Sequence, residues 1–262
     1  MDDATTYLQT MMDSAAREGK PLVLDPITYS CRSLMVPNGL VMTAHSPGGY
    51  GVPIGAHAKI ELIAGTNDHL LRGAVGVGHV RITGVHFDGN KNNNARGDVI
   101  HLDDTSTPEE AQWHVRDCFI EAGATNGIYV GNGRRCAQIS DSTINYNRSV
   151  GVRLNGSDAH LDRCIIGSNG EVGVGVGGTV VDVHECDIYN NRTGVIVYST
   201  LTKVTVRANR IDRHDRAAVL VSSGCRDVLV KDNVLHSNRA NIVDLSGGGN
   251  SIIKRDNIIG ME

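Results

Sequence analysis

The segment Leu161-Asp-Arg-Cys-Ile-Ile166, followed downstream by Gly173-Val-Gly-Val176, recurs along the chain. Each copy begins at an apolar residue, the anchor, and the main anchors are 24, 22, 22, 23 and 24 residues apart. A repeat of this length predicts a solenoid in which each copy forms one turn, or rung. A weaker copy begins at Ile82, and a last one has Lys254 at the anchor position. The main anchors are Val115, Ile139, Leu161, Val183, Val206 and Val230.

Each copy also carries a second short segment in which apolar residues alternate, as is typical of a half-buried strand. No helical pattern separates the strands, so the chain must make its parallel connections by winding as a coil. Rungs stacked about 4.8 Å apart give parallel sheets whose inner faces form one core. The sequence therefore predicts an all-β fold, a parallel β-helix. The second segments are Gly127–Val130, Gly151–Leu154, Gly173–Val176, Gly194–Val197, Ala218–Val221 and Asn241–Asp244.

Two columns of polar or small residues support this register. Asparagine stands eight residues after most anchors, where stacked side chains can hydrogen-bond from rung to rung. Three of the six cysteines, Cys118, Cys164 and Cys186, share a second column. Stacked rungs are slightly too far apart for a relaxed disulfide, so we predict buried free thiols. The asparagine column holds Asn90, Asn147, Asn169, Asn191 and Asn238, with Gly123 and His214 as exceptions.

We predict a single domain over residues 1–262, with rungs over 30–250 and a C-terminal cap over 251–262. Residues 1–20 are expected to contain a helix that covers the end of the coil, with Thr5 or Thr6 as its N-cap residue. An insertion near residues 90–112 is either a functional loop or an ordinary solvated one. Asp103 and Asp104 in it could bind Ca²⁺ or act as acids, and no other cofactor is expected. The helix face expected to be buried carries Tyr7, Leu8, Met11, Met12 and Ala15.

Net charge and hydropathy bear on two kinds of partner, nucleic acids and membranes. A formal net charge of −4 argues weakly against nucleic acid, whose phosphates favour a basic surface. No apolar run approaches the ~18 residues of a membrane-spanning helix, so we expect no membrane insertion. No secretory signal is visible at the start of the sequence.

Several early motifs carry a family resemblance. They are Asp2-Asp3-Ala4-Thr5, Pro26-Ile-Thr-Tyr29, Val36-Pro-Asn-Gly-Leu-Val41 and Phe87-Asp-Gly-Asn90. With the repeat, they resemble the pectate-lyase-like, single-stranded right-handed β-helix superfamily, closest in style to phage tailspike and glycoside hydrolase 28-related chains. The resemblance implies a polysaccharide bound in a groove along the coil. It specifies function weakly, because this fold hosts lyases, hydrolases, epimerases and non-catalytic adhesins.

Charged residues line two columns beside the anchors. Asp117 and Asp141 stack one rung apart, within the ~5 to 9.5 Å that separates the carboxylates of glycosidases. His184 beside Glu185 suits proton abstraction. Alternatively, these charges simply pair on an exposed sheet face. The first column holds Arg116, Ser140, Asp162, His184, Arg207 and Lys231, and the second holds Asp117, Asp141, Arg163, Glu185, Ala208 and Asp232.

From these columns we predict two sets of site residues and no metal ligands. The predicted catalytic residues are Asp117, Asp141, Asp162, His184, Glu185 and Arg207. The predicted substrate-binding residues are Arg116, Arg163, Lys231 and His214, the last within the run Asp212–Arg216. The run is either an acid/base cluster or a solvated corner.

The leading hypothesis is a phage tail or tailspike-type protein that recognises a bacterial surface polysaccharide. Such a protein would be located in the virion tail or outside the cell. If it is an enzyme, it also degrades the polysaccharide. The second strands carry an apolar strip that includes Ile196, Leu220 and Val243. The strip is either an interface, with other copies in a homotrimer or with another tail protein, or a surface that is covered within one chain.

One alternative is a free polysaccharide lyase, glycoside hydrolase or epimerase. Against it, the Asn-Thr-Asp and Gly-His-Gly motifs of polygalacturonases and the Asp-Pro-His-Asp run of alginate epimerases are absent. A second alternative is a non-catalytic adhesive or structural solenoid.

Overall fold

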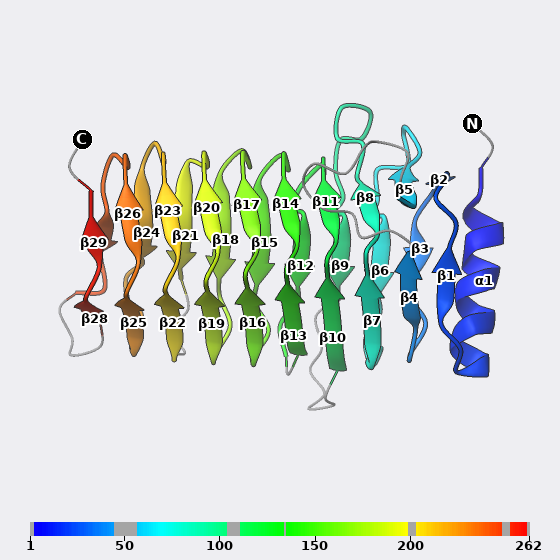
Figure 1. Cartoon of the computed structure of the whole chain (residues 1–262), viewed down its shortest axis with the longest axis horizontal. Helices are drawn as coiled ribbons and strands as arrows, with labels where there is room; N and C mark the ends of the chain where they lie inside the picture. Colours follow the sequence, from blue (N-terminus) through cyan, green and yellow to red (C-terminus); the bar gives the residue numbers. More distant parts are fainter. Residues whose placement is uncertain are drawn as a thin grey trace.

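The computed structural model describes residues 3–44, 57–103, 111–133, 135–198, 203–247 and 252–260. Over these residues the chain winds into a parallel β-solenoid with one short helix, α1, at its N-terminal end (Figure 1). Each full rung contributes one strand to each of three parallel sheets, here called A, B and C. None of the helices in the described residues is long and apolar enough to cross a membrane.

Sheets A and B each have ten strands, stacked in chain order. Sheet A contains β1 (Leu22–Leu24), β4 (Val41–Ala44), β7 (Val80–Thr83), β10 (Ala111–Arg116), β13 (Arg135–Ser140), β16 (Ala159–Asp162), β19 (Val181–His184), β22 (Val204–Arg207), β25 (Val228–Lys231) and β28 (Ile252–Arg255). Sheet B contains β2 (Thr28–Cys31), β5 (Lys59–Leu62), β8 (His86–Asp88), β11 (Phe119–Glu121), β14 (Thr143–Asn145), β17 (Ile165–Gly167), β20 (Asp187–Tyr189), β23 (Arg210–Asp212), β26 (Val234–His236) and β29 (Ile258–Ile259).

Sheet C has nine strands and contains the second segments of the repeat. Its strands lie behind those of sheets A and B in Figure 1. They are β3 (Leu34–Met35), β6 (Leu71–Gly73), β9 (Ile100–Leu102), β12 (Ile128–Val130), β15 (Val150–Leu154), β18 (Val172–Val176), β21 (Thr193–Val197), β24 (Ala217–Val221) and β27 (Ile242–Asp244).

The anchor column is confirmed. The six main anchors are direct partners on neighbouring strands of sheet A, each at most 3% exposed. Ile82 pairs with Val115, and Lys254 pairs with Val230 at the other end. The column forms because alternate residues of a strand face the same side, and the anchors face the core.

The asparagine ladder is also confirmed. The Asn147 backbone N–H donates to Asn169 Oδ1 (3.1 Å), and the Asn169 N–H donates to Asn191 Oδ1 (2.9 Å). These amides satisfy backbone groups at the bend between sheets B and C, where they are buried. The cysteines are free thiols, and all but the half-buried Cys136 are buried.

The corner between sheets A and B explains the second charged column. Its members have left-handed backbone conformations, including Asp117 (φ 52°), Asp141 (φ 51°) and Glu185 (φ 52°). Such a residue ends one strand and turns the chain sharply into the next. These side chains therefore project from a corner, whereas the first column stands on the outer face of sheet A.

Helix α1 (Thr5–Glu18) covers the first rung, with Leu8 and Met12 fully buried, and Gly19 ends it at φ 63°. Two helix details differ from expectation. Tyr7 is 61% exposed, so it does not belong to the buried face. Neither Thr5 nor Thr6 caps the helix; Ala4 is at the N-cap position, and Thr5 Oγ1 accepts the Arg32 N–H (2.7 Å).

The apolar strip on sheet C is partly covered within the chain. Leu220 is only 5% exposed, and Ile196 and Val243 are half-buried. Of the two alternatives, these burials favour coverage within the chain, and the trimer interface stays a prediction.

Candidate functional site

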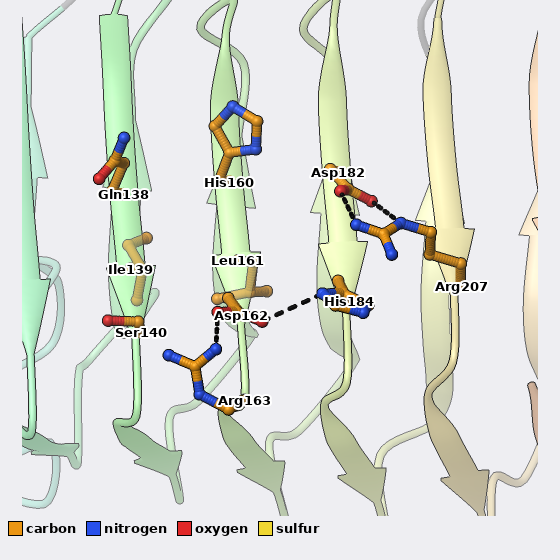
Figure 2. A pocket seen from close by; sticks show the side chains of 10 residues that line it. All are labelled: Gln138, Ile139, Ser140, His160, Leu161, Asp162, Arg163, Asp182, His184 and Arg207. Carbon is orange, nitrogen blue, oxygen red and sulfur yellow. Dashed lines mark hydrogen bonds and ion pairs between the residues drawn. The ribbon is translucent and has the colours of Figure 1, made fainter.

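A polar hollow of about 410 Å³ lies on the outer face of sheet A, across strands β13, β16, β19 and β22 (Figure 2). The strands pair in one regular parallel register here, so their outward side chains form a grid. In this grid Asp162 is the direct neighbour of His184, and His160 is the direct neighbour of Asp182. Acid and imidazole groups therefore alternate in both directions. The polar residues that line the hollow are Gln138, Ser140, His160, Asp162, Arg163, Asp182, His184 and Arg207.

His184 lies between two carboxylates. Its Nδ1 is 3.2 Å from Asp162 Oδ1, and its Nε2 is 3.2 Å from Glu185 Oε1. One carboxylate therefore lies within ion-pair distance of each ring nitrogen. Glu185 is half exposed at its corner, so Nε2 is the nitrogen that a bound molecule can reach once that side chain moves aside.

The arginines of the hollow are held by carboxylates. Arg207 contacts Asp182 through Nε (3.2 Å) and Nη2 (2.8 Å), and this hydrogen bonding raises the pKa of Arg207. Arg163 donates from Nε to Asp141 Oδ1 (2.7 Å) and also pairs with Asp162. The Arg163 hydrogen bond holds the pKa of Asp141 below its usual range.

The structure brings four predicted residues together in the hollow, with Glu185 beside them. The four are Asp162, Arg163, His184 and Arg207. Lys231 stands further along the same face, next to Arg207, and pairs with Asp232 (3.3 Å).

The predicted carboxylate pair Asp117 and Asp141 is not free. Arg116 Nε lies between them, 3.2 Å from Asp117 Oδ2 and 3.4 Å from Asp141 Oδ2. Together with Arg163, this arginine keeps the corner charges neutralised. That this pair supplies an acid and a base for glycoside cleavage stays a prediction.

His214 is also corrected, because it is 2% exposed and replaces an asparagine of the ladder. Its Nδ1 lies 3.2 Å from the Asn191 backbone nitrogen, and its Nε2 lies 3.1 Å from the Ile188 carbonyl oxygen. Burial lowers the pKa of His214, which favours the neutral ring. The ring thus substitutes for the oxygen and nitrogen of an asparagine amide and cannot contact a substrate. Asp212 in the same run is 2% exposed, so the run is not simply a solvated corner.

Sequence reasoning missed His160 and Asp182. Each stands one residue before an anchor, His160 before Leu161 and Asp182 before Val183. Because the side chains of a strand alternate, the residues just before and just after an inward-facing anchor both face outward. The alternation of a strand was the signal that would have found them.

Within the described residues, two groups of three side chains bring metal-type ligand atoms within 4.8 Å of one another: Asp162, His184 and Glu185, and His69, Asp98 and His101. In the first, His184 turns different nitrogens toward Asp162 and Glu185. In the second, His69 and His101 are stacked with ring centroids 3.7 Å apart and planes 23° apart. Nearly parallel rings cannot aim their in-plane lone pairs at one ion. Here Asp98 Oδ2 instead accepts from His101 Nδ1 (2.6 Å).

Asp103, a predicted Ca²⁺ ligand, pairs with basic side chains of the chain. Arg72 Nε lies 3.1 Å from both Asp103 carboxylate oxygens, and His101 Nε2 lies 3.2 Å from Oδ1. Asp104 lies outside the described residues.

Basic residues continue from the hollow toward the C-terminal end of sheet A. His184, Arg207, Lys231 and Arg255 are direct partners on four consecutive strands. The row therefore presents one basic group about every 4.8 Å.

Residues 126–261, more than half of the chain, match the family described as "Right handed beta helix region". The chain therefore belongs to the family of right-handed β-helix proteins. A search of curated proteins finds no match.

Solved structures with the same fold come from several kinds of protein. The A-module of the Azotobacter vinelandii mannuronan C-5 epimerase AlgE6 is 14% identical, with a TM-score of 0.63 over 100% of this chain and 96% of that one. Pectate lyase Pel9A is 9% identical (TM-score 0.68, 94% and 73% covered). The enzymatically active domain of tailspike protein 2 of bacteriophage CBA120 is 11% identical (TM-score 0.69), and the match covers 98% of this chain but 44% of that one. At these identities the likeness shows the fold alone.

Proposed function

We propose that the protein binds an acidic bacterial polysaccharide along the outer face of sheet A and acts on it at His184. The observation that carries this proposal is the polar hollow, from which the basic row of His184, Arg207, Lys231 and Arg255 continues. A regular row of basic side chains on a rigid sheet suits a polymer that carries regularly spaced negative charge.

In this proposal the residues have separate roles. His184 holds and moves a proton through Nε2, while Asp162 fixes the orientation of the ring through Nδ1. Arg207 and Lys231 contact acidic groups of the polymer. The named solved relatives include a pectate lyase, a mannuronan epimerase and tailspike proteins, and this range supports a polysaccharide without selecting a reaction.

We further propose that the chain works as a tail or tailspike-type protein of a phage, at the virion tail. The alternative is a free polysaccharide lyase, hydrolase or epimerase. Asp162 and Asp182 favour hydrolysis within that alternative, because these diagonal neighbours bring two carboxylates into one hollow, as glycosidases do. The second alternative is a non-catalytic adhesin, which binds the polysaccharide without cleaving it.

The test combines binding and product detection. Wild-type protein is run through gels containing acidic or neutral polysaccharides, and the same mixtures are assayed for new reducing ends and unsaturated products. We expect retardation by acidic polymers only, weakened in Arg207→Gln but not in the matched surface control Arg239→Gln. Equal retardation in the two variants would place binding elsewhere, and none at all would refute the proposal. Binding without product identifies an adhesin.

The mass in solution separates the tail protein from the free enzyme. A stable homotrimer, measured by light scattering, supports the tailspike-type role. A monomer that releases product supports the free enzyme.

A further inference from the structure

Arg153 projects from the outer face of sheet C, on a different side of the coil from the hollow. It stands on β15 between Tyr129 of β12 and Gly175 of β18. Two aromatic rings flank its guanidinium, with Cζ 6.0 Å from the Tyr129 ring centroid and 5.4 Å from that of Tyr198. Such contacts hold a guanidinium in place without neutralising it.

The flanking rings are fixed by their own contacts. Asn155 Nδ2 donates to the Tyr129 hydroxyl (3.3 Å), and the Tyr198 hydroxyl donates to Asn155 Oδ1 (3.4 Å). Tyr198 lies across two glycines, since a Cβ on Gly175 would be 3.0 Å from its hydroxyl oxygen. A Cβ on Gly177 would be 2.7 Å from its ring. The sheet therefore leaves space for Tyr198 to reach Arg153.

No carboxylate of the described residues pairs with Arg153, and its buried Nε has no hydrogen-bond partner. Tyr198 is its polar neighbour, but burial raises the pKa of that hydroxyl, so the ring carries no charge at neutral pH. Elsewhere the chain provides carboxylates for such groups. Arg72, in the same column of sheet C, pairs with Asp103 (3.0 Å), and Arg207 pairs with Asp182 (2.8 Å).

We propose that Arg153 is the centre of an oxyanion-binding site on sheet C. A partly buried guanidinium without a counter-charge is unfavourable unless an anion completes it. The planar fork of arginine binds carboxylate, sulfate or phosphate through two parallel hydrogen bonds. The ligand is an oxyanion, borne by an acidic sugar or free in solution. The site does not depend on the proposed function of sheet A.

The test titrates the protein with sodium glucuronate, acetate, phosphate, sulfate and neutral glucose at constant ionic strength. The readouts are the NMR signal of the Arg153 Nε–H and the thermal unfolding midpoint. We expect a saturable shift with the oxyanions and none with glucose. A preference for glucuronate over acetate identifies an acidic sugar as the source, and equal response identifies a free oxyanion.

Three variants make the result decisive. Arg153→Gln should lower the affinity at least tenfold, while Arg239→Gln, on an exposed corner, should leave it unchanged. Gly175→Ala, which displaces Tyr198 and keeps the charge, should weaken binding to an intermediate degree. If Arg153→Gln does not fold, the Nε–H signal of the wild type still decides. The proposal is overturned if that signal shows no saturable change with millimolar oxyanion, or if Arg153→Gln binds as the wild type does.

Discussion

The carboxylate of Asp182 holds the guanidinium of Arg207 at two points, with contacts of 3.2 and 2.8 Å. The two residues lie on adjacent strands but are not direct partners, because Arg207 pairs in register with His184. The contact is therefore diagonal, and it orients Arg207 across the hollow while neutralising its charge.

Replacing Asp182 with Asn should strengthen binding of an acidic polysaccharide. The change removes a competing carboxylate, and one partly screened charge contact of about 1 kcal/mol corresponds to roughly a fivefold change in affinity. Affinity is measured by titration at fixed salt, with Asp215→Asn as the control of equal charge change at an exposed corner. Weaker binding in Asp182→Asn would mean that the orientation of Arg207 matters more than its free charge.

Replacing His184 with Gln should separate binding from chemistry. If the protein releases product, we expect its rate to fall by about 100-fold or more, since a positioned acid/base group contributes that much. Polymer affinity should change little. His114→Gln is the control, because it lies on β10 outside the hollow. Initial rates of product formation check this, and an unchanged rate would exclude His184 as the proton carrier.

The buried ring of His214 should make stability depend on pH. Its pKa is lowered in the folded chain by burial, while the unfolded value is about 6.5. The stability it contributes is therefore present above about pH 6.5 and is lost as the pH falls toward the folded value, by up to about 1.4 kcal/mol per pH unit. Asp212 and Asp215 face it and act in the opposite direction.

His214→Asn should restore the ladder and remove this dependence. Urea unfolding between pH 7 and 5 measures it, with His236→Asn at a more exposed position as the control. If both variants lose stability with acid as the wild type does, the carboxylates are responsible and His214 is not.

The last described rung carries an ion pair at its inner positions. Lys254 and Asp244 occupy the inner positions that Val230 and Val221 hold one rung earlier, and Lys254 Nζ lies 3.0 Å from Asp244 Oδ2. Ile259 on the same rung is 57% exposed. Lys254→Met should leave stability within about 1 kcal/mol, because a half-exposed pair contributes little. It should increase end-to-end association by enlarging the apolar end. Sedimentation at several concentrations measures this, with Lys203→Met as the control. A strictly monomeric Lys254→Met would show that the charge has no such role.

The buried thiols should resist alkylation. Burial raises the pKa of both Cys31 and Cys118 to about 12, so almost no thiolate forms at neutral pH. Mass spectrometry after iodoacetamide treatment should find Cys136 modified first in the native protein and all six cysteines modified in denaturant. Rapid native modification of Cys118 would indicate that its rung opens.

The sequence by itself determined the rungs, their register and the columns. The reason is that an apolar anchor every 22 to 24 residues, together with the alternation of a strand, allows one stacking that keeps the anchors inside. The same regularity placed Asp162, His184 and Arg207 on one outer face. It could not place Asp117 and Asp141, because a left-handed corner turns these side chains away from the sheet.

Only the tertiary structure decided which outward groups meet. Long side chains reach diagonally across rungs, as Arg207 does to Asp182, and a column read from sequence shows direct neighbours only. The position of His214 in the ladder is visible in sequence, but its isolation from solvent depends on the surrounding rungs. Tyr198 illustrates the same limit, because it folds back over Gly175 to reach Arg153. A repeat defines the backbone, whereas the site depends on where flexible side chains find partners.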